Sequence, residues 1–518
     1  MSFSVHIMRV TLQAETPISI GASGAVERKI KLTDRAGAGF GNANDADTVI
    51  ATAIVRDANG LPTIPGSSTQ GILRHLMHEV AGEERVREVF GYEDSDGSGR
   101  SSGLSISWGC IHDSQDRAIV GLEQRDLETD SVLKLLLSDA PIWRDRVSLS
   151  ETHSVEEKKK FARIAVPVGT RFSIEFLARG GAEKLALLLE VGRLLRHSRF
   201  RLGSGTGIGW GKCKVVRASC QSIAAQETRE LRKILAQAPS EPLADDALSQ
   251  DAFAPPEADT TVATLSLTFD DALRIGSSDD AVNVASEREN NLLRVLREPY
   301  FDWSCSKQAT ISMHFPLTGS GLRGPLAHRM LFYARKDAGK TLSVDEFLEL
   351  GREDQMAKLT NLAARPEMLS DFLGKSKDAD EKDEAGSASR LTVGEATLEG
   401  GALKTVQHNA IDRFTGGTID GALYEEEWLI GAKAGLELSI RPPLNPADRE
   451  GTVAGWDASV VSCFLKALKD LCSESLPVGA KSLGVCRGNI SWSGENRDEW
   501  VSAALSVGLN SATEVAGQ

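Results

Sequence analysis

The chain has 518 residues, which is too long for a single hydrophobic core and indicates roughly two to four domains. Apolar residues make up 41% of it without a run long enough to span a membrane, and the alternating N-terminus does not resemble a signal peptide. Its 59 Lys and Arg against 73 Asp and Glu give a net charge of −14, which argues against a free nucleic-acid binder, and its seven scattered cysteines predict free thiols in a reducing cytoplasm rather than a zinc site.

The elements, taken in chain order, follow one pattern that occurs twice. Each half opens with a strand of alternating apolar and polar residues that ends at a glycine, at 5–21 and again at 261–276. A proline-led glycine turn then enters a helix, as LPTIPGSSTQG at 61–71 and as FPLTGSGLRG at 315–324. We expect the small hydroxyl residues of these turns to cap the helix and leave its first amides pointing outward.

Two further landmarks complete each half. An Asp-Arg pair precedes a later strand, as Asp145-Arg146 and as Asp412-Arg413. An amphipathic helix, a glycine-rich loop and a strand then close the half, with GSGTGIGWGK at 203–212 and VGAKSLGVCRG at 478–488. The order predicts βαββαβ, so we expect an α+β protein of two tandem ferredoxin-like, RRM-like domains with thumb and loop insertions.

Domain limits follow from the repeat and from local composition. We place the first domain at 1–220 and the second at 261–518. Residues 221–260 begin with a helical pattern and end rich in Ala and Pro, which predicts a linker. A second irregular region at about 336–389 predicts an insertion within the second domain.

The first glycine-rich loop does not fit a nucleotide-cofactor motif. Thr206 stands where a phosphate loop needs its first glycine, and Cys213 follows Lys212 where Ser or Thr is needed. Ile208 stands where a dinucleotide fingerprint needs its third glycine. Two interpretations stay open: a tight turn that packs backbone on backbone, or a loop whose amides meet phosphate oxygens beside Arg199 and Arg201.

These landmarks together resemble the RAMP superfamily, most closely the backbone branch of type III CRISPR effector complexes. The family's helix entry is matched by Pro65–Gly71, and its following FG pair by Phe90 and Gly91. Its DR-x-T-G segment is matched at Asp412–Gly416, whereas in the first half Ser148 and Leu149 replace the Thr and Gly. A fused pair of such modules is similar to the double subunits of type III-D-like systems.

The resemblance implies a subunit that grips guide RNA, with CRISPR RNA, target RNA and other effector subunits as partners and no membrane. The implied RNA-binding residues lie in the helix entries, the Asp-Arg pairs, the glycine loop and a lysine-rich thumb: Ser67, Ser68, Gly71, Arg74, His75, Arg146, Lys158, Arg199, Arg201, Gly205, Gly207, Lys212, Ser320, Arg323, His328 and Arg413. Each has a simpler interpretation, because single cations and lysine runs are common on solvated faces.

The resemblance also implies cleavage of guide-paired target RNA, with a loop aspartate and Mg²⁺ or Mn²⁺. The candidates are Asp47 and Asp45 in the long segment after the first strand, and Asp279 and Asp280 in the second half. Asp47 and Asp280 are the expected metal ligands. Aspartates in loops also serve as turn formers, so this assignment is open.

Two other functions remain open from the sequence, and an unrelated metabolic enzyme is disfavoured by the failed cofactor motifs. A repeat that has lost its aspartate would still bind RNA as a structural subunit. A guide-precursor endoribonuclease would need no metal but would need an acid–base group near a glycine loop, and His197 is the candidate.

Overall fold

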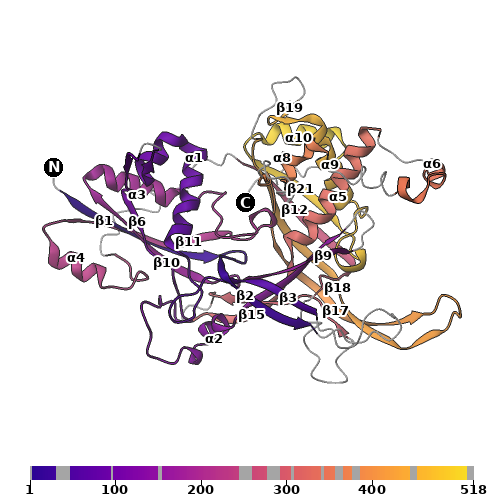
Figure 1. Cartoon of the computed structure of the whole chain (residues 1–518), viewed down its shortest axis with the longest axis horizontal. Helices are drawn as coiled ribbons and strands as arrows, with labels where there is room; N and C mark the ends of the chain where they lie inside the picture. Colours follow the sequence, from indigo (N-terminus) through magenta and orange to yellow (C-terminus); the bar gives the residue numbers. More distant parts are fainter. Residues whose placement is uncertain are drawn as a thin grey trace, which may run out of the picture.

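The computed structural model describes residues 3–30, 47–94, 97–149, 155–243, 260–276, 292–304, 308–339, 344–355, 366–375, 386–443 and 452–509. The chain forms two mixed α+β halves with antiparallel central sheets, which lie side by side in Figure 1. This confirms the predicted α+β class. None of the helices in the described part of the chain is long and apolar enough to cross a membrane.

The central sheet of the first half is antiparallel and has the spatial order β11-β1-β10-β6. Its strands are β1 (Ser4–Ala14), β6 (Leu104–Ile106), β10 (Arg171–Gly180) and β11 (Cys213–Ala224), and β7 (Cys110–Ile111) also pairs with β10. Helix α1 (Gly66–Phe90) lies between β1 and β6 in the chain, and α3 (Ala182–Leu194) lies between β10 and β11. Both helices lie above this sheet in Figure 1.

The other face of this sheet is covered by part of the segment predicted as a linker. Helix α4 (Thr228–Leu235) packs Ile234 against Val5 and Ile7 of β1. The buried Arg9 donates to the carbonyl oxygens of Ile234 and Glu241, at 2.6 and 3.1 Å. These contacts explain why β1 is buried on both faces, although its sequence alternates.

A second, four-stranded sheet in the first half has the order β2-β3-β9-β8. It consists of β2 (Gly21–Ile30), β3 (Asp47–Ile54), β8 (Ile142–Leu149) and β9 (Val155–Ala165). We expected a long loop over 21–51 and a strand after it. The loop expectation was wrong for 21–30 and 47–51, because β2 and β3 already pair there as antiparallel strands. The β-branched residues of 48–54 favour a strand, but the glycine and asparagine residues before them hid this signal.

The central sheet of the second half has the order β21-β12-β18-β16. Its strands are β12 (Thr261–Leu273), β16 (Leu391–Val393), β18 (Thr418–Ile440) and β21 (Arg487–Gly494), and its two long helices are α5 (Gly319–Asp337) and α9 (Ala458–Cys472). Strand β17 (Ala396–Ile411) pairs with β18 to form a long hairpin that projects at the lower right of Figure 1. Strands β13 (Leu292–Leu293), β14 (Glu298–Asp302) and β15 (Thr310–Leu317) extend this sheet.

Shorter elements complete the described chain. The strands are β4 (Tyr92–Glu93), β5 (Gly99–Arg100), β19 (Thr452–Val453) and β20 (Trp456–Asp457). The helices are α2 (Ser131–Leu137), α6 (Val344–Leu348), α8 (Ser370–Leu373) and α10 (Arg497–Ser506). The 3₁₀ turns are η1 (Leu127–Thr129), η2 (Thr206–Ile208), η5 (Glu367–Leu369) and η6 (Ala480–Ser482).

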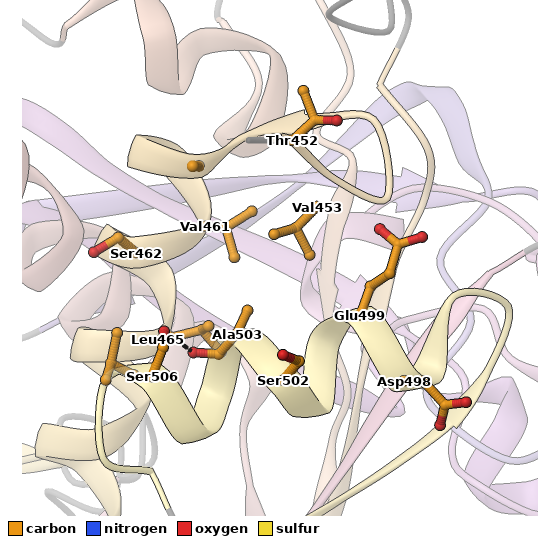
Figure 2. Close-up of a pocket in the computed structure, with 12 residues that line it drawn as sticks. Thr452, Val453, Val461, Ser462, Leu465, Asp498, Glu499, Ser502, Ala503 and Ser506 are labelled. Carbon is orange, nitrogen blue, oxygen red and sulfur yellow. Dashed lines mark hydrogen bonds between the residues drawn. The ribbon is translucent and has the colours of Figure 1, made fainter. Parts of the chain in front are cut away.

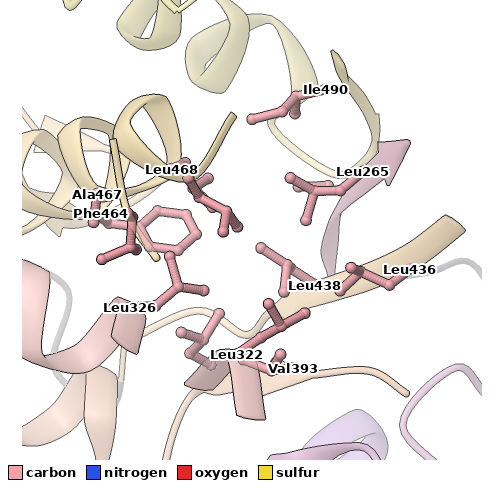
Figure 3. Close-up of a cluster of buried hydrophobic side chains, with 14 of the residues drawn as sticks. Leu265, Leu322, Leu326, Val393, Leu436, Leu438, Phe464, Ala467, Leu468 and Ile490 are labelled. Carbon is pink, nitrogen blue, oxygen red and sulfur yellow. The ribbon is translucent and has the colours of Figure 1, made fainter. Parts of the chain in front are cut away.

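Each half has its own large hydrophobic core. In the second half, leucines of the sheet such as Leu265 and Leu438 meet Phe464 and Leu468 of α9 and Leu326 of α5 (Figure 3). Each fully buried side chain of this kind stabilises the fold by about 1.5–3 kcal/mol. Each half therefore has an interior of its own.

The two halves are nevertheless joined by buried contacts. Arg144 of β8 donates to Glu298 of β14, at 2.5 and 2.7 Å, and to Glu395, which also accepts the indole N–H of Trp210 at 2.8 Å. Phe301 of the second half lies in the core of the first. The two halves are therefore packed against each other through buried contacts and are not separate, independently placed domains.

Candidate nucleic-acid interface

Strands β8 and β9 place three arginines on one face of the four-stranded sheet. Arg144 lies opposite Arg163, and Arg146 lies opposite Phe161. Opposite residues of an antiparallel pair point to the same face, and so do residues two apart on one strand. The three arginines and Phe161 therefore share a face, and the intervening Asp145 points to the other.

Arg146 is a half-buried cation with unused hydrogen-bond donors. Its guanidinium carbon lies 4.9 Å from the centre of the buried Trp210 ring. Its Nε and Nη2 atoms are buried and have no hydrogen-bond partner among the residues described. Burial and the neighbouring charges of Arg163 and Arg144 lower the pKa of Arg146 to about 10, and Glu395 opposes this shift only in part. The group stays cationic at neutral pH, and an anion would supply the acceptors that it lacks.

The first glycine-rich loop brings a hydroxyl group to this face. Arg163 donates from Nη1 to the Oγ of the exposed Ser204 at 2.8 Å. The preceding Gly203 has φ +81°, and a Cβ added to it would lie 2.2 Å from the carbonyl oxygen of Ser19. Only glycine fits this close approach, and it is what turns Ser204 outward beside Arg163.

Exposed apolar side chains lie next to these cations. Strand β3 runs parallel to β9 with Thr52 beside Arg163, which places Ile50 near Phe161 on the same face. Ile50 is 55% exposed and Phe161 is 43% exposed. One acid, the exposed Glu27, lies opposite Ile50 on this face. Exposed rings beside arginines suit a single-stranded nucleic acid, whose bases stack and whose phosphates pair with cations.

The entry of α1 differs from the capping that we expected. The residue before the helix is Pro65, no side chain caps the first turn, and Ser68 donates its backbone N–H to the Pro65 carbonyl at 3.0 Å. Ser67 and Gly71 are exposed, as are Arg74 and His75, and Ser68 is half-buried. The capping prediction was therefore wrong for this half, although the first turn does reach solvent.

The entry of α5 does have a side-chain cap, and its arginine has a structural role. Thr318 accepts a hydrogen bond from the backbone of Gly321 at 3.1 Å, and Ser320 is half-buried beside it. Arg323 donates to the carbonyl oxygens of Gly207, Leu391 and Leu373, at 3.2, 2.8 and 2.7 Å. It therefore fastens the glycine loop of the first half to the second half. His328 lies half-buried further along α5.

The two ends of the glycine loop agree with different interpretations of its sequence, one end being accessible and the other packed. Residues 203–207 remain partly or fully accessible, with Gly205 in a left-handed conformation at φ +81°. Residues 208–211 are buried, and a Cβ on Gly209 would lie 2.8 Å from the Gly394 Cα of the second half. The second stretch therefore packs backbone on backbone.

The cations that flank the loop are engaged within the protein. Arg199 donates to Glu79 at 2.7 Å, and Lys212 lies 3.0 Å from a carboxylate oxygen of Glu437. Arg201 donates to the carbonyl oxygens of Ser198 and Phe200, and burial lowers its pKa. His197 is 4% exposed, and its Nδ1 accepts the backbone N–H of Arg199 at 3.1 Å.

Several predicted residues lie at the limits of the described structure. Asp47 is the first residue of β3, and its side chain is outside the description, as is that of Lys158 in β9. Asp45, Asp279 and Asp280 lie outside the described residues altogether. Within the described residues, no group of three or more His, Cys, Asp or Glu side chains is arranged to hold a metal ion.

The two Asp-Arg pairs are not structurally equivalent, contrary to the expectation. Arg146 lies within strand β8, whereas Arg413 lies exposed in the turn that joins β17 to β18. Asp412 accepts the backbone N–H groups of Phe414 and Thr415, at 2.7 and 2.9 Å, which lowers its pKa. It therefore shapes the turn, whose Phe414 is fully exposed.

Sequence reasoning missed Arg163, Phe161, Ile50 and Trp210. Alternation of FARI within a strand indicates that Phe161 and Arg163 share a face, and this signal was available. Their closeness to Arg146 and Ser204 depends on strand register and on the loop fold, which no local pattern shows.

A pocket elsewhere is less suited to RNA. It has a volume of about 660 Å³ and opens between α9, α10 and β19, with Val461, Leu465 and Ala503 in its wall. Asp498 and Glu499 lie at one end of it (Figure 2). Carboxylates repel phosphate, so we do not place RNA there.

Comparison with known proteins agrees with the first half of the fold. A family model described as the RAMP superfamily matches residues 11–214. The matched stretch contains β8, β9 and the glycine-rich loop. The face formed by Arg146, Arg163, Phe161 and Ile50, called the Arg146 face below, therefore lies within the matched stretch. No curated protein matches the chain.

Among solved structures, the chain is similar to one described as a cryo-EM structure of the Type III-B Cmr-beta bound to cognate target RNA. The identity is 12% and the TM-score is 0.25. The match covers 42% of this chain and 61% of that chain, so this protein spans about three fifths of the length of the structure that it matches.

Proposed function

We propose that this protein is a guide-RNA-binding, backbone-type subunit of a type III CRISPR effector complex, formed by two tandem ferredoxin-like RAMP modules. The RAMP match supports this for residues 11–214, and the strand orders β11-β1-β10-β6 and β21-β12-β18-β16 support a second copy of the module. We place the modules at 1–220 and 261–518, joined by 221–260. The type III-D-like assignment rests on the sequence resemblance, and the cytoplasmic location rests on the scattered cysteines.

The Arg146 face is the observation that carries the proposal. A half-buried guanidinium whose Nε and Nη2 are buried without acceptors, next to Arg163, is costly unless an anion is present. Phe161 and Ile50 add exposed apolar surface for bases. A ribose-phosphate chain provides both kinds of partner, whereas a free anion would use only the cations.

The test is RNA binding by the full-length protein as a function of salt. Arg146→Ala is expected to weaken binding of single-stranded RNA and to reduce the slope of log K against log salt by about 0.7, because one phosphate contact is lost. Arg179→Ala is the control, since Arg179 is exposed on β10, away from this face. Equal affinity and slope in the two variants would remove the proposed site.

The assignment to a CRISPR complex has its own test. The protein is tagged in its native host and purified with its partners, and the bound RNA is sequenced. The proposal expects short RNAs that share a constant 5′ segment and differ beyond it. Recovery of RNA without such a segment would argue for an RNA-binding protein outside CRISPR defence.

We further propose cleavage of guide-paired target RNA with Mg²⁺ or Mn²⁺, using Asp47 or Asp45 in the first module and Asp279 or Asp280 in the second. Metal-assisted cleavage needs a carboxylate beside the scissile phosphate. Asp47→Asn combined with Asp280→Asn is expected to abolish cutting while RNA stays bound. Unchanged cutting would leave a purely structural RNA-binding subunit.

A guide-precursor endoribonuclease that works without metal is the second candidate. The burial of His197 argues against that residue as its acid–base group. Cutting of a precursor RNA in the presence of EDTA would favour this candidate over the first.

A further inference from the structure

A histidine, a tyrosine, a glutamate and a tryptophan lie together on one face of the β17–β18 hairpin. His408 lies opposite Tyr424, and the next same-face pairs along the hairpin bring Glu426 opposite Val406 and Trp428 opposite Lys404. The four side chains therefore form one cluster in the second half, separate from the Arg146 face.

The contacts within this cluster orient the histidine. The His408 ring stacks on Tyr424, with ring centres 5.1 Å apart and planes 19° apart, and lies 5.6 Å from the Trp428 ring centre. His408 Nε2 lies 3.4 Å from a carboxylate oxygen of Glu426. The same oxygen accepts the indole N–H of Trp428 at 3.1 Å.

Burial differs sharply between the side chains of His408 and Glu426. The Glu426 side chain is 0% exposed, whereas the His408 side chain is 27% exposed. A buried carboxylate is held in place and interacts strongly with a neighbouring imidazole, because little water screens it. His408 Nε2, which faces Glu426, is buried. The exposed part of the ring therefore excludes that nitrogen, and Nδ1 is the nitrogen left to meet a ligand along the hairpin.

A carboxylate behind a histidine stabilises the imidazolium that forms when the histidine takes a proton. The hairpin also offers features that suit RNA, namely the exposed Phe414 and Arg413 in its turn and the exposed Lys404 near its base. The cluster thus combines a proton acceptor with a surface on which a ribose-phosphate chain fits.

We propose that His408 is a catalytic residue that accepts the proton of a ribose 2′-hydroxyl during RNA cleavage, and that Glu426 is its positioning residue. This inference rests on the proposed RNA binding. The freed 2′-oxygen bonds to phosphorus while the bond from phosphorus to the 5′-oxygen breaks. The leaving oxygen takes a proton from water, and the imidazolium returns its proton to solvent. The products end in a 2′,3′-cyclic phosphate and a 5′-hydroxyl, and the step holds with or without a bound cation.

A similar pair in the first half shows why exposure matters. His112 contacts Asp116 at 2.7 Å through Nδ1 and Ser173 at 2.8 Å through Nε2. The side chain of His112 is 0% exposed, and Ser173 is equally buried. No substrate reaches that group, which we regard as structural.

The experiment uses the protein tagged in its native host and purified with the complex and guide RNA that it carries. A labelled RNA complementary to the guide is added with Mg²⁺, and its binding and cleavage are measured separately. His408→Gln is expected to reduce the cleavage rate at the second module's site by roughly 100-fold or more, the scale of general-base catalysis, with unchanged RNA binding. Gln407→Ala is the matched control, because Gln407 is exposed on the opposite face of the same strand.

Two further variants separate catalysis from folding. Added imidazole is expected to restore part of the activity of His408→Ala, which a merely structural histidine would not allow. Glu426→Gln keeps an acceptor for Trp428, so it is expected to lower kcat and leave KM unchanged. Cutting by His408→Gln at the natural rate at the second module's site, or RNA binding by the natural protein without any cutting, would overturn the inference. Absence of bound RNA would instead refute the proposed function, and this inference with it.

Discussion

Replacement of Arg144 by methionine is expected to destabilise the protein more than any surface change. Arg144 and Glu298 are each 4% exposed in their side chains, and Glu395 is 6% exposed. Burial disfavours the Arg144 charge, but Glu395 and Glu298 outweigh it and raise the pKa of Arg144. Arg144→Met leaves two buried carboxylates without their cation, which costs about 3–5 kcal/mol of unfolding free energy.

A compensated variant tests whether the uncompensated carboxylate charges, rather than the loss of the Arg144 side chain itself, cause the destabilisation. In Arg144→Met combined with Glu298→Leu and Glu395→Gln, no uncompensated charge remains, and the new side-chain amide still offers an oxygen to the indole N–H of Trp210. We expect its stability to return to within about 1–2 kcal/mol of the natural chain. Urea unfolding followed by tryptophan fluorescence measures all three proteins.

The control is Arg217→Met, which removes a 45% exposed arginine from its contact with Asp116. An exposed ion pair contributes about 0–1 kcal/mol, so this variant should unfold close to the natural chain. If Arg144→Met lost no more stability than Arg217→Met, the buried network would not hold the halves together.

Three other predictions concern the same interface and its surroundings. Phe301→Ala removes a ring that the second half inserts into the core of the first, and should lower the unfolding free energy of the first half by about 3–5 kcal/mol in urea titrations. Gly209→Ala places a Cβ against Gly394 at φ +87°, so its melting temperature should fall, whereas Gly71→Ala meets nothing within 4 Å and should leave it unchanged or raise it. Burial lowers the pKa of His314 below its ordinary value of about 6.5, so the unfolded chain binds a proton at higher pH than the folded chain does. The free energy of unfolding should therefore decrease as the pH falls below about 6.5, and it should decrease less in His314→Gln. Thermal melts across about pH 5 to 8 measure both proteins.

The fold was predictable wherever the local sequence marks an element, by alternation of apolar and polar residues or by a proline-led turn. The strands beginning at Ser4 and Thr261 alternate, and the helix entries at Gly66 and Gly319 follow a proline-led turn, so their order could be read directly. The β2–β3 hairpin was missed because a glycine-rich stretch separates two short strand signals. The prediction that the two Asp-Arg pairs are equivalent was wrong because the position of such a pair, in a strand or in a turn, depends on the length of the hairpin. A short sequence match does not specify that length.

The candidate site was less predictable because pairing, not spacing, assembles it. Arg146 was selected from a motif, but its unused donors depend on burial under Trp210 and on the charge of Arg163 across the strand pair. The role of Arg323 was interpreted from its place beside a helix N-terminus, yet it reaches a carbonyl oxygen of the other half. Contacts between residues more than 100 positions apart leave no mark in a single sequence.

The glycine-rich loop shows how one segment serves both halves. Its buried end, at residues 208–211, needs a glycine at 209 because Gly394 approaches the backbone there, and the start of α5 at Gly319 lies against the Ile208 carbonyl oxygen. Its accessible end, at residues 203–207, holds Ser204 beside Arg163. Because the buried end is fixed by the second half, the position of Ser204 depends on that half as well. If RNA binds here, loosening the interface at Gly209 should therefore weaken RNA binding even though Gly209 itself is buried.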